Sequence, residues 1–436
     1  MRILETSHQK EEILKLLNRR LRFQDEAGLN LASKVKSIID KVKQGGDQAL
    51  CEFSAQFDQV KLTPEQLKVA KTEFEEALTT VPQTFITAIR QAYANIMEFH
   101  TKQLPKDWLD LKEDGIILGQ RYLPVASAGL YVPGGMAGST PLVSSLLMNA
   151  IPAIVAGVKR IIICTPPGQR GKVNAYLLAA ARECGISEIY KVGGGQAIAA
   201  MAYGTETIEP VDVIAGPGNQ YVTEAKRQVF GYVGLDILAG PSEIVIIAAE
   251  NNNPEFIAAD LLSQAEHGPV NEAGAFLLTD SAKLAKEVIQ VLERQLNDLS
   301  RHEIARASLE LNGGVIITRD LAEAVELANY TAPEHLELLV PDPWNFLGQI
   351  KNAGAIFIGP YSTEPIGDYV AGTNHVLPTN STARFASGLS VDTFMKKTSI
   401  ISYNQAGINK YGEAAITIAK VEGLDAHARA VEIRIT

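Results

Sequence analysis

The sequence is poor in cysteine. It contains three cysteines in 436 residues, at positions 51, 164 and 184, and no two of them form a CxxC pair. An odd and scattered set excludes a disulfide framework and a thiolate zinc site. Any bound metal would therefore need oxygen and nitrogen ligands. Free thiols fit a reducing compartment best, so we expect a cytoplasmic protein.

The sequence also lacks a long basic run and a long uninterrupted apolar run. Acidic residues outnumber basic ones by 50 to 40, which disfavours nucleic-acid binding because that affinity depends on clustered Lys and Arg. The N-terminus has no apolar core typical of a signal peptide. The most apolar stretch, 141–158, carries Ser, Asn and two prolines and indicates a buried helix and turn rather than a membrane span. We expect neither nucleic acid nor membrane as a partner.

The apolar pattern changes along the chain. Residues 9–103 carry apolar positions three and four apart, which predicts helices. From 115, short apolar runs alternate with helical segments, and a second cycle of this kind starts at 243. This βαβα alternation predicts parallel sheets covered by helices on both faces. We therefore expect an α/β protein with two sheets of similar build.

The predicted organisation follows from these changes in pattern. A chain of 436 residues suggests about two or three domains. The last fifty residues predict a strand and two helices, too small for a core of their own, so we expect them to dock elsewhere, with a partner subunit as one option. The predicted parts are an N-terminal helical arm (1–25), a main α/β domain (26–130 plus 239–385), a second α/β domain (131–238) and a C-terminal tail (386–436).

One segment, "LLSQAEHGP", brings an amide and an imidazole together before a helix stop. Gln264 and His267 are three residues apart and share a helix face, and Gly268-Pro269 cannot continue the helix. Such a pair offers an oxygen and a nitrogen to a metal, for which zinc is suitable. The alternative is an ordinary polar helix end, where a histidine is favoured by the helix dipole.

Two later segments carry further candidates. "TAPEHLEL" places Glu334 beside His335, and such a pair can supply two proton-transfer groups, although solvated polar residues at a strand start are the alternative. "PIGDYVAGTNHVLPT" holds Asp368 and His375 in a polar, glycine-bearing segment of the kind that builds sites. Asp368 would complete a metal's ligand set, and His375 would hydrogen-bond a substrate or support the site.

Glycine-rich segments occur at 131–141, 191–204 and 214–222. Each follows a strand-like run and precedes a helix, where backbone N–H groups can meet a phosphate. None completes G-x-G-x-x-G, because Ile198 stands at the third glycine position after Gly193. A modified dinucleotide site remains open, since all three segments would gather at one edge of one parallel sheet.

Taken together, these segments resemble the histidinol dehydrogenase family. The resemblance covers essentially the whole chain, and the ordered set of motifs is far more specific than any one of them. The segments that carry it, in family order, are "AGLYVPGG", "GGGQAIAA", "VIAGPGNQYV", "LAGPSE", "LLSQAEHGP", "APEHLEL", "GDYVAGTNHVLPT" and "EGLDAHARA".

The resemblance implies a homodimeric enzyme with two similar, incomplete Rossmann-like domains. It implies zinc-dependent, NAD-linked oxidation of L-histidinol to L-histidine through L-histidinaldehyde, the last steps of histidine biosynthesis, with one zinc per subunit. The main domain would hold the zinc and catalytic residues, the second domain would lie on the NAD side, and the C-terminal tail would reach the partner's site.

The resemblance also implies a role for individual residues. Glu334 and His335 would be the acid/base groups, and both would contact the substrate. Glu422 and His427, in the tail, would serve the partner's site, while Glu266 has no assigned role. The implied zinc ligands, which also contact substrate, are Gln264, His267, Asp368 and His427. The other implied substrate contacts are Ser242, His375 and Glu422, and the implied NAD contacts are Tyr131, Gln196 and Asn219.

Two other functions can be drawn from the same residues. A zinc hydrolase could use the His, Asp and Gln set with an adjacent Glu to activate water, but the three glycine-rich segments disfavour it. A non-catalytic metal-binding or scaffold protein would require the Glu334-His335 pair to be incidental. Manganese or cobalt could substitute for zinc in such a ligand set.

Overall fold

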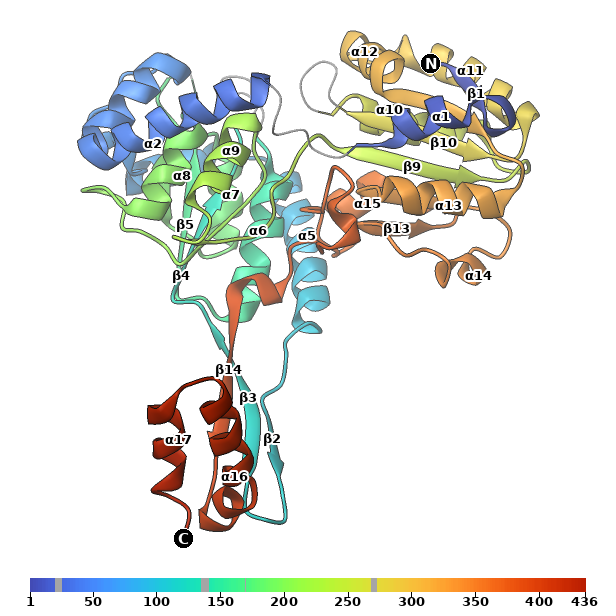
Figure 1. Cartoon of the computed structure of the whole chain (residues 1–436). Coiled ribbons are helices and arrows are strands. Elements are labelled where there is room, and N and C mark those ends of the chain that lie inside the picture. The colour runs from blue at the N-terminus through green and yellow to red at the C-terminus, as the bar shows by residue number, and fades with distance from the viewer. Residues whose placement is uncertain (20–25, 135–140, 169, 268–272) are drawn as a thin grey trace.

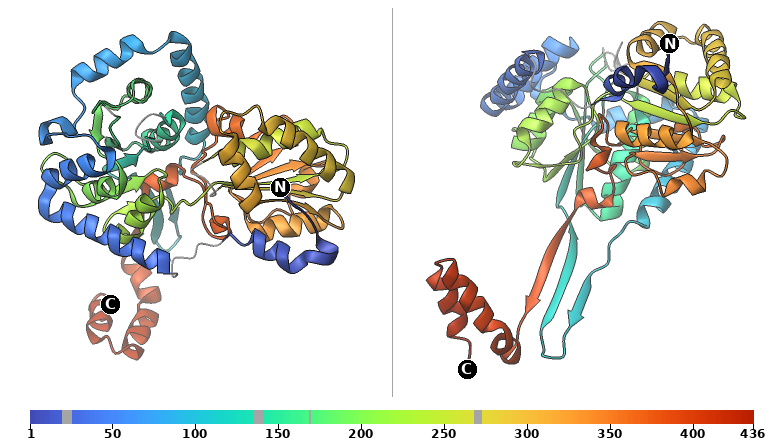
Figure 2. Two further views of the ribbon diagram at one scale, coloured as in Figure 1. Left: turned by 90° about the horizontal axis from the view of Figure 1, so that it is seen from above. Right: turned by 45° about the vertical axis from the view of Figure 1, so that its right-hand side comes forward.

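The computed structural model describes residues 1–19, 26–134, 141–168, 170–267 and 273–436. Two lobes, each built on a parallel sheet, lie side by side, and a long arm ending in the C-terminus projects from them (Figures 1 and 2). None of the helices in these ranges combines the length and the apolar character needed to cross a membrane.

The first lobe contains a six-stranded parallel sheet in the order β1-β11-β10-β9-β12-β13. Its strands β9, β10 and β12 are wholly buried because helices cover both faces, whereas the edge strands β1 and β13 are more exposed. One face packs on α10, α11 and α12, and the other packs on α1 and α13. The strands are β1 (Ile3–Glu5), β9 (Glu243–Ala248), β10 (Gly274–Thr279), β11 (Gly313–Ile317), β12 (His335–Leu339) and β13 (Ala355–Ile358). The helices are α1 (Thr6–Leu17), α10 (Pro254–Ala265), α11 (Ala282–Leu296), α12 (His302–Asn312), α13 (Leu321–Thr331), α14 (Trp344–Leu347) and α15 (Glu364–Tyr369).

The second lobe contains a five-stranded parallel sheet in the order β6-β5-β4-β7-β8. Apolar side chains of α4, α5, α6 and α7 pack on one face of this sheet, and those of α2, α8 and α9 pack on the other. The strands are β4 (Ser127–Tyr131), β5 (Arg160–Thr165), β6 (Glu188–Lys191), β7 (Val213–Ala215) and β8 (Gly234–Leu235). The helices are α2 (Glu26–Phe53), a π-helical turn (Ser54–Asp58), α3 (Pro64–Leu67), α4 (Lys71–Thr80), α5 (Gln83–Thr101), α6 (Val143–Ala156), α7 (Ala175–Glu183), α8 (Gly194–Tyr203) and α9 (Gln220–Val229).

The two sheets share one topology. If the strands are numbered along the chain from β9 in the first lobe and from β4 in the second, both sheets have the strand order 3-2-1-4-5. This is the order of a Rossmann sheet that lacks its sixth strand. The first lobe adds β1 beside its third strand, from the start of the chain. The predicted pair of similar, incomplete Rossmann-like sheets is therefore confirmed.

The predicted domain boundaries need correction. Residues 1–25 were expected as a separate arm, but β1 pairs with β11, and Ile13 and Leu17 of α1 are buried in the first lobe; residues 20–25 lie outside the described ranges. Residues 26–130 were expected to join 239–385. Instead, helices α2 to α5 bury their apolar faces against the five-stranded sheet of the second lobe. An amphipathic pattern predicts that a helix has a buried face but does not say which sheet buries it.

The arm is an antiparallel sheet that the sequence pattern did not predict. Strand β14 (Met395–Ser402) pairs along its whole length with β3 (Ile117–Pro124), and β2 (Trp108–Leu111) pairs on the other side of β3. Helices α16 (Gln405–Val421) and α17 (Asp425–Glu432) follow and pack on each other at the far end of the arm (Figure 1). Two short 3-10 turns, Thr382–Arg384 and Val391–Phe394, precede β14. The tail thus has the expected strand and two helices.

Candidate active site

The candidate site lies at the amino edge of the six-stranded sheet, where its chain order reverses. β9 and β12 are neighbours at this point, with His335 in register with Ile244. Glu243 is the first residue of β9, His335 is the first residue of β12, and Glu334 immediately precedes it. The end of α10 brings Gln264, and the sheet edge thus collects charged and amide groups from strands far apart in sequence.

His335 is held in one tautomer. Its Nδ1 lies 3.2 Å from the main-chain oxygen of Glu243 and 3.1 Å from Oε1 of Gln264. Because a carbonyl oxygen can only accept, Nδ1 carries the hydrogen and Nε2 keeps its lone pair. Nε2 is buried, has no hydrogen-bond partner among the described residues, and lies 3.8 Å from Oδ1 of Asp368. Burial lowers the pKa of His335 to about 3, and the neighbouring His267 adds to the effect.

Glu334 is buried beside this imidazole. Its Oε2 accepts a hydrogen bond from the main-chain N–H of Glu243 at 3.0 Å and lies 3.6 Å from Nδ1 of His335. Burial raises the pKa of Glu334 well above the usual carboxyl range, although hydrogen bonds from the Glu243 amide and the Ser242 side chain oppose the rise. The predicted substrate contact Ser242 thus lies at the same place as the predicted acid/base pair.

A possible metal-binding group lies opposite His335. Ligand atoms of His267, Glu364 and Asp368 all lie within 4.8 Å of one another. Nδ1 of His267 lies 2.9 Å from the main-chain oxygen of Ser263, which directs Nε2 toward Oε1 of Glu364 at 4.0 Å. Burial raises the pKa of Asp368 to about 6, and His267 opposes this rise.

Sequence reasoning missed Glu364. It lies at the start of α15, four residues before Asp368, so both carboxylates share one helix face. Its side chain is fully buried; Oε2 accepts from the Ser263 hydroxyl at 2.9 Å, while Oε1 has no hydrogen-bond partner among the described residues. Burial raises the pKa of Glu364 to about 7, and the nearby Asp368 contributes. The spacing of four residues between Glu364 and Asp368 was a signal in the sequence. An acidic residue in a first helical turn is also common, however, because it interacts favourably with the helix dipole.

His375 reaches the same site from the loop after α15. Its Nδ1 lies 3.0 Å from the main-chain oxygen of Asp368 and 3.9 Å from Oδ2 of that residue. Burial lowers the pKa of His375 to about 4, so the ring is neutral near neutral pH. Asp368 and His375 were predicted to belong to one site, and the structure places them side by side.

Two predicted site residues, Glu422 and His427, are not brought to this site by the described chain. Glu422 and His427 are exposed on the terminal helices of the arm, far from the sheet edge (Figure 1). Glu266 is the partly exposed C-cap residue of α10, which ends at Ala265. The predicted helix stop at Gly268-Pro269 lies in 268–272, outside the described residues.

The predicted NAD contacts lie on the other lobe, at the carboxyl edge of its sheet. Tyr131 ends β4, and its hydroxyl accepts a hydrogen bond from the Gly194 N–H at 3.0 Å. Gln196 is buried in the first turn of α8. Asn219 caps α9 by accepting hydrogen bonds from two amides of its first turn, at 3.0 and 3.2 Å. Residues 135–140 of the first glycine-rich segment lie outside the described ranges.

The carboxyl edge also requires glycine where β7 ends. Gly216 has φ +114°, and a Cβ there would lie 2.1 Å from the main-chain oxygen of Tyr131. No residue with a side chain fits so close to a neighbouring backbone. The glycine in "IAGPG" thus allows the ends of β4 and β7 to approach each other at the position where the chain order of this sheet reverses.

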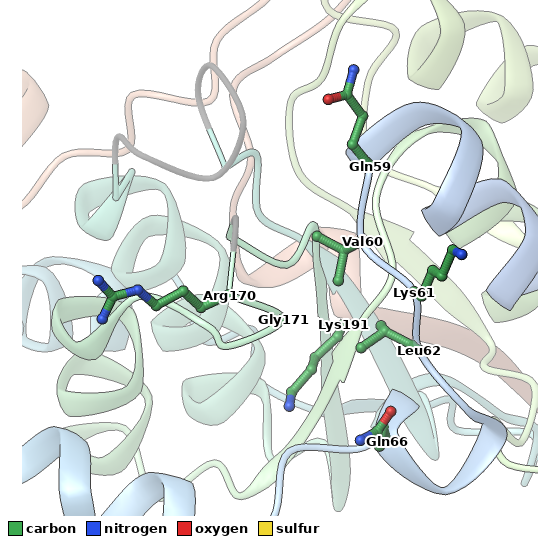
Figure 3. Close-up of a pocket in the computed structure, with 8 residues that line it drawn as sticks. All are labelled: Gln59, Val60, Lys61, Leu62, Gln66, Arg170, Gly171 and Lys191. Atoms are coloured by element: carbon green, nitrogen blue, oxygen red, sulfur yellow. The ribbon is translucent and has the colours of Figure 1, made fainter.

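The second lobe also contains a cavity of about 320 Å³ (Figure 3). Its most buried cation, Lys191, is paired with Glu73 at 2.6 Å, and Arg170 extends away from the other lining side chains. None of the predicted site residues lines this cavity. The lining residues are Gln59, Val60, Lys61, Leu62, Gln66, Arg170, Gly171 and Lys191.

The donor set of the first lobe fits a zinc ion. Several buried side-chain atoms of the described residues lack a hydrogen-bond partner, and two of them, Nε2 of His335 and Oε1 of Glu364, lie at this sheet edge with a lone pair available. A buried polar atom without a partner can indicate an absent ion, water or ligand. Both atoms lie close to Asp368 or His267, and this group offers the nitrogen and oxygen donors that zinc accepts.

A family model for histidinol dehydrogenase matches residues 21–435. The chain belongs to the histidinol dehydrogenase family. It is 53% identical over 401 residues to the histidinol dehydrogenase of Geobacillus kaustophilus, covering 92% of this chain and 93% of that protein. It is 52% identical over 400 residues to the histidinol dehydrogenase of Bacillus subtilis, covering 92% of each. The crystal structure of histidinol dehydrogenase from Elizabethkingia anophelis superposes with a TM-score of 0.91 at 39% identity, covering 97% of this chain and 95% of that one.

These findings confirm the family, the α/β fold and the dehydrogenase class expected from the sequence. The individual site assignments in this family member rest on the geometry above, which brings Ser242, Gln264, His267, Glu334, His335, Asp368 and His375 to one sheet edge.

Proposed function

We propose that this protein oxidises L-histidinol to L-histidine through L-histidinaldehyde, as the closing steps of histidine biosynthesis, with zinc and NAD. The observation that carries the proposal is the buried Glu334-His335 pair beside His267 and Asp368 at one sheet edge. The buried free cysteines are consistent with a reducing compartment, and we place the enzyme in the cytoplasm.

His335 is the base in the first oxidation. Its Nδ1–H is occupied by the Glu243 carbonyl, and its free Nε2 faces Asp368. Burial lowers the pKa of His335 to about 3, so the ring is neutral near neutral pH. The lowered pKa keeps the Nε2 lone pair available for the hydroxyl proton of the substrate as hydride leaves the carbinol carbon, but it also makes the ring a weaker base than an exposed histidine. In the second oxidation it accepts a proton again, from the hydrated aldehyde.

Glu334 activates the water that attacks the aldehyde between the two oxidations. Its pKa is raised by burial, so the carboxylate is a stronger base than an exposed one. The hydrogen bond from the Glu243 amide fixes the position of Oε2, and a general base needs a fixed position relative to the reacting carbon.

Gln264, His267 and Asp368 would hold zinc, together with His427 of the partner subunit, and Glu364 lies next to them. Zinc, when bound, supplies a Lewis acid that orients the amine and imidazole of the substrate. Tyr131, Gln196 and Asn219 would contact NAD, which supplies the hydride acceptor in each of the two oxidations. His375, Ser242 and Glu422 of the partner subunit would contact the substrate.

A homodimer with shared sites is supported by the apolar surface of the arm. The exposed fractions of Val421 and Ile401 are 84% and 72%, and several other large apolar side chains of the arm are also exposed. Several exposed large apolar side chains on one small arm are a feature of protein interfaces. The arm carries Glu422 and His427 away from the chain's own site, and a second subunit would receive them there.

The proposed reaction is tested by mixing the purified protein with zinc, NAD and L-histidinol and following the absorbance of reduced cofactor. We expect two equivalents of reduced NAD per histidine formed, and reversible loss of turnover after dialysis against a strong chelator. Cleavage of an amide or ester without cofactor reduction would favour a zinc hydrolase instead, and full turnover in metal-free protein would contradict the proposal.

The shared site is tested with two inactive variants, His335→Asn and His427→Asn. We expect His427→Asn to weaken zinc binding, measured by competition with a chromogenic chelator. Mixing the two variants should restore part of the activity, because one hybrid site then carries both native residues. If subunits exchange and no activity returns, each chain builds its own site.

A further inference from the structure

Glu243 contacts both members of the acid/base pair through its main chain. Its N–H donates to Oε2 of Glu334 at 3.0 Å, and its carbonyl accepts from Nδ1 of His335 at 3.2 Å. The peptide groups on the two sides of one residue therefore fix the orientation of a carboxylate and the tautomer of an imidazole. Any rotation of the backbone at Glu243 would displace both groups at once.

The side chain of Glu243 is anchored by a cation from a distant part of the chain. Glu243 is 0% exposed, and its Oε2 accepts from Nε of Arg19 at 3.2 Å, with the arginine side chain 12% exposed. Arg19 follows α1 and is the last described residue before the chain crosses to the second lobe. Breaking a buried ion pair leaves an uncompensated charge, so the remaining partner must be neutralised or move toward water.

A glycine at the edge of the six-stranded sheet leaves space for Arg19. Gly274, the first residue of β10, is in register with Glu243 on the neighbouring strand. A Cβ at Gly274 would lie 3.2 Å from Cζ and 3.3 Å from Nη2 of Arg19, closer than side chains normally approach. The glycine leaves room for the guanidinium over the strand ends, which shows that the pair is built into the edge of the sheet.

We propose that Arg19 is a positioning residue for the oxidation, acting through Glu243 on Glu334 and His335. The inference rests on the proposed function of those two residues. Arg19 acts at one remove from both: it holds the side chain of Glu243 so that the first peptide groups of β9 keep their orientation. A displacement of the acid/base pair by about 1 Å lowers turnover strongly, even when the change is remote from the reacting atoms.

The first test is Arg19→Met, which keeps much of the apolar length and removes the cation. We expect kcat to fall about ten- to a hundredfold, with the KM for histidinol and the bound zinc within about twofold of wild type. Arg19→Lys, which keeps the charge, should recover a large part of the lost kcat. A merely structural role would lower the melting temperature without this separation of kcat from KM.

Arg2→Met is the matched control on the same segment. Arg2 forms an exposed ion pair with Glu12 at 3.3 Å, with exposed fractions of 45% and 48%, and such pairs contribute little. We expect its kcat to equal that of wild type. Equal kcat in wild type and Arg19→Met would overturn the inference, whereas absence of cofactor reduction by wild type itself would overturn the proposed function.

A double variant provides a second measurement. In Arg19→Met/Glu243→Gln the buried carboxylate is gone, so no unpaired charge remains, and we expect kcat to be no lower than in Arg19→Met alone. Should Arg19→Met fail to fold, Glu243→Gln decides the matter, because it removes the same ion pair from the other side. A wild-type kcat in Glu243→Gln would overturn the inference, and a lowered kcat with unchanged KM would support it.

Discussion

The two lobes have the same strand order but place functional groups at opposite edges of their sheets. In the six-stranded sheet, Glu334 and His335 lie at the amino ends of the central strands, where the chain order reverses. In the five-stranded sheet, Tyr131 is the last residue of β4, and Asn219 follows the carboxyl end of β7. Carboxyl edges are the usual binding side of such sheets, so the first lobe is the exception.

The difference fits the division of roles proposed above. At the carboxyl edge, the helices α8 and α9 begin, and helix starts suit the phosphates of a nucleotide without any ionised side chain. At the amino edge, proton transfer and metal binding need side chains that ionise, and those side chains are buried. They require fixed partners, which the main chain of Glu243 and the end of α10 supply.

The largest effect is expected at the amino edge. His335→Asn removes the base nitrogen but keeps a side chain of similar polarity, so kcat should fall about a hundred- to ten-thousandfold while bound zinc is retained. Turnover by stopped-flow absorbance and metal analysis measure the two quantities. His302→Asn, on the exposed start of α12, is the control and should keep full activity. An active His335→Asn would exclude the assigned base.

An intermediate effect separates the two lobes. Asn219→Ala removes the cap of α9 and should raise the KM for NAD about tenfold while costing about 1 kcal/mol of stability. Asn253→Ala removes the equivalent cap of α10 in the other lobe, where Asn253 accepts from the Glu255 N–H. It should cost similar stability and leave the KM for NAD unchanged. If Asn219→Ala and Asn253→Ala changed the KM for NAD equally, the loss of a helix cap alone would explain both changes.

The smallest effect concerns a buried carboxyl under the amino edge. Glu337 on β12 accepts from the Glu364 N–H at 3.1 Å, and burial, followed by the Asp260 carboxylate, raises its pKa to about 9. It is therefore protonated at neutral pH, and Glu337→Gln should keep nearly full activity.

The pH dependence of stability checks this assignment. Because the folded-state pKa of Glu337 lies above its unfolded value, its contribution to stability is present below about pH 4.5 and is lost as pH rises through about 9. The melting temperature of wild type should thus fall relative to that of Glu337→Gln between pH 6 and 9. Parallel curves for the two proteins would mean that the carboxyl is ionised already at pH 6.

The sequence predicted the sheets and most of the site because local patterns carry that information. The apolar run at 243–249 became β9 (Glu243–Ala248), and the motif residues from Gln264 to His375 converge on one edge. Which sheet the helices of 26–103 cover could not be predicted, because an amphipathic face suits either sheet. The pairing of β3 with β14 joins segments far apart in sequence, and no local pattern specifies such a partner.

Glu364 and Arg19 illustrate a further limit. Each acts through burial and through a contact with a residue remote in the chain, such as His267 for Glu364 and Glu243 for Arg19. In the sequence, Glu364 reads as an acid in a first helical turn and Arg19 as part of a short basic pair. Only the folded chain shows that Glu364 lies near the acid/base pair and that Arg19 contacts Glu243, which supports that pair.

The antiparallel pair of strands β3 and β14 sets the length of the arm. Its eight paired residues, from Met395 opposite Pro124 to Ser402 opposite Ile117, set how far the terminal helices stand from the lobes. Removing two residues from each strand keeps every side chain on its original face but retracts the tip by about 7 Å, since a strand advances about 3.4 Å per residue. The length of the arm is thus determined by the length of its strands, and it can be shortened in defined steps without altering either lobe.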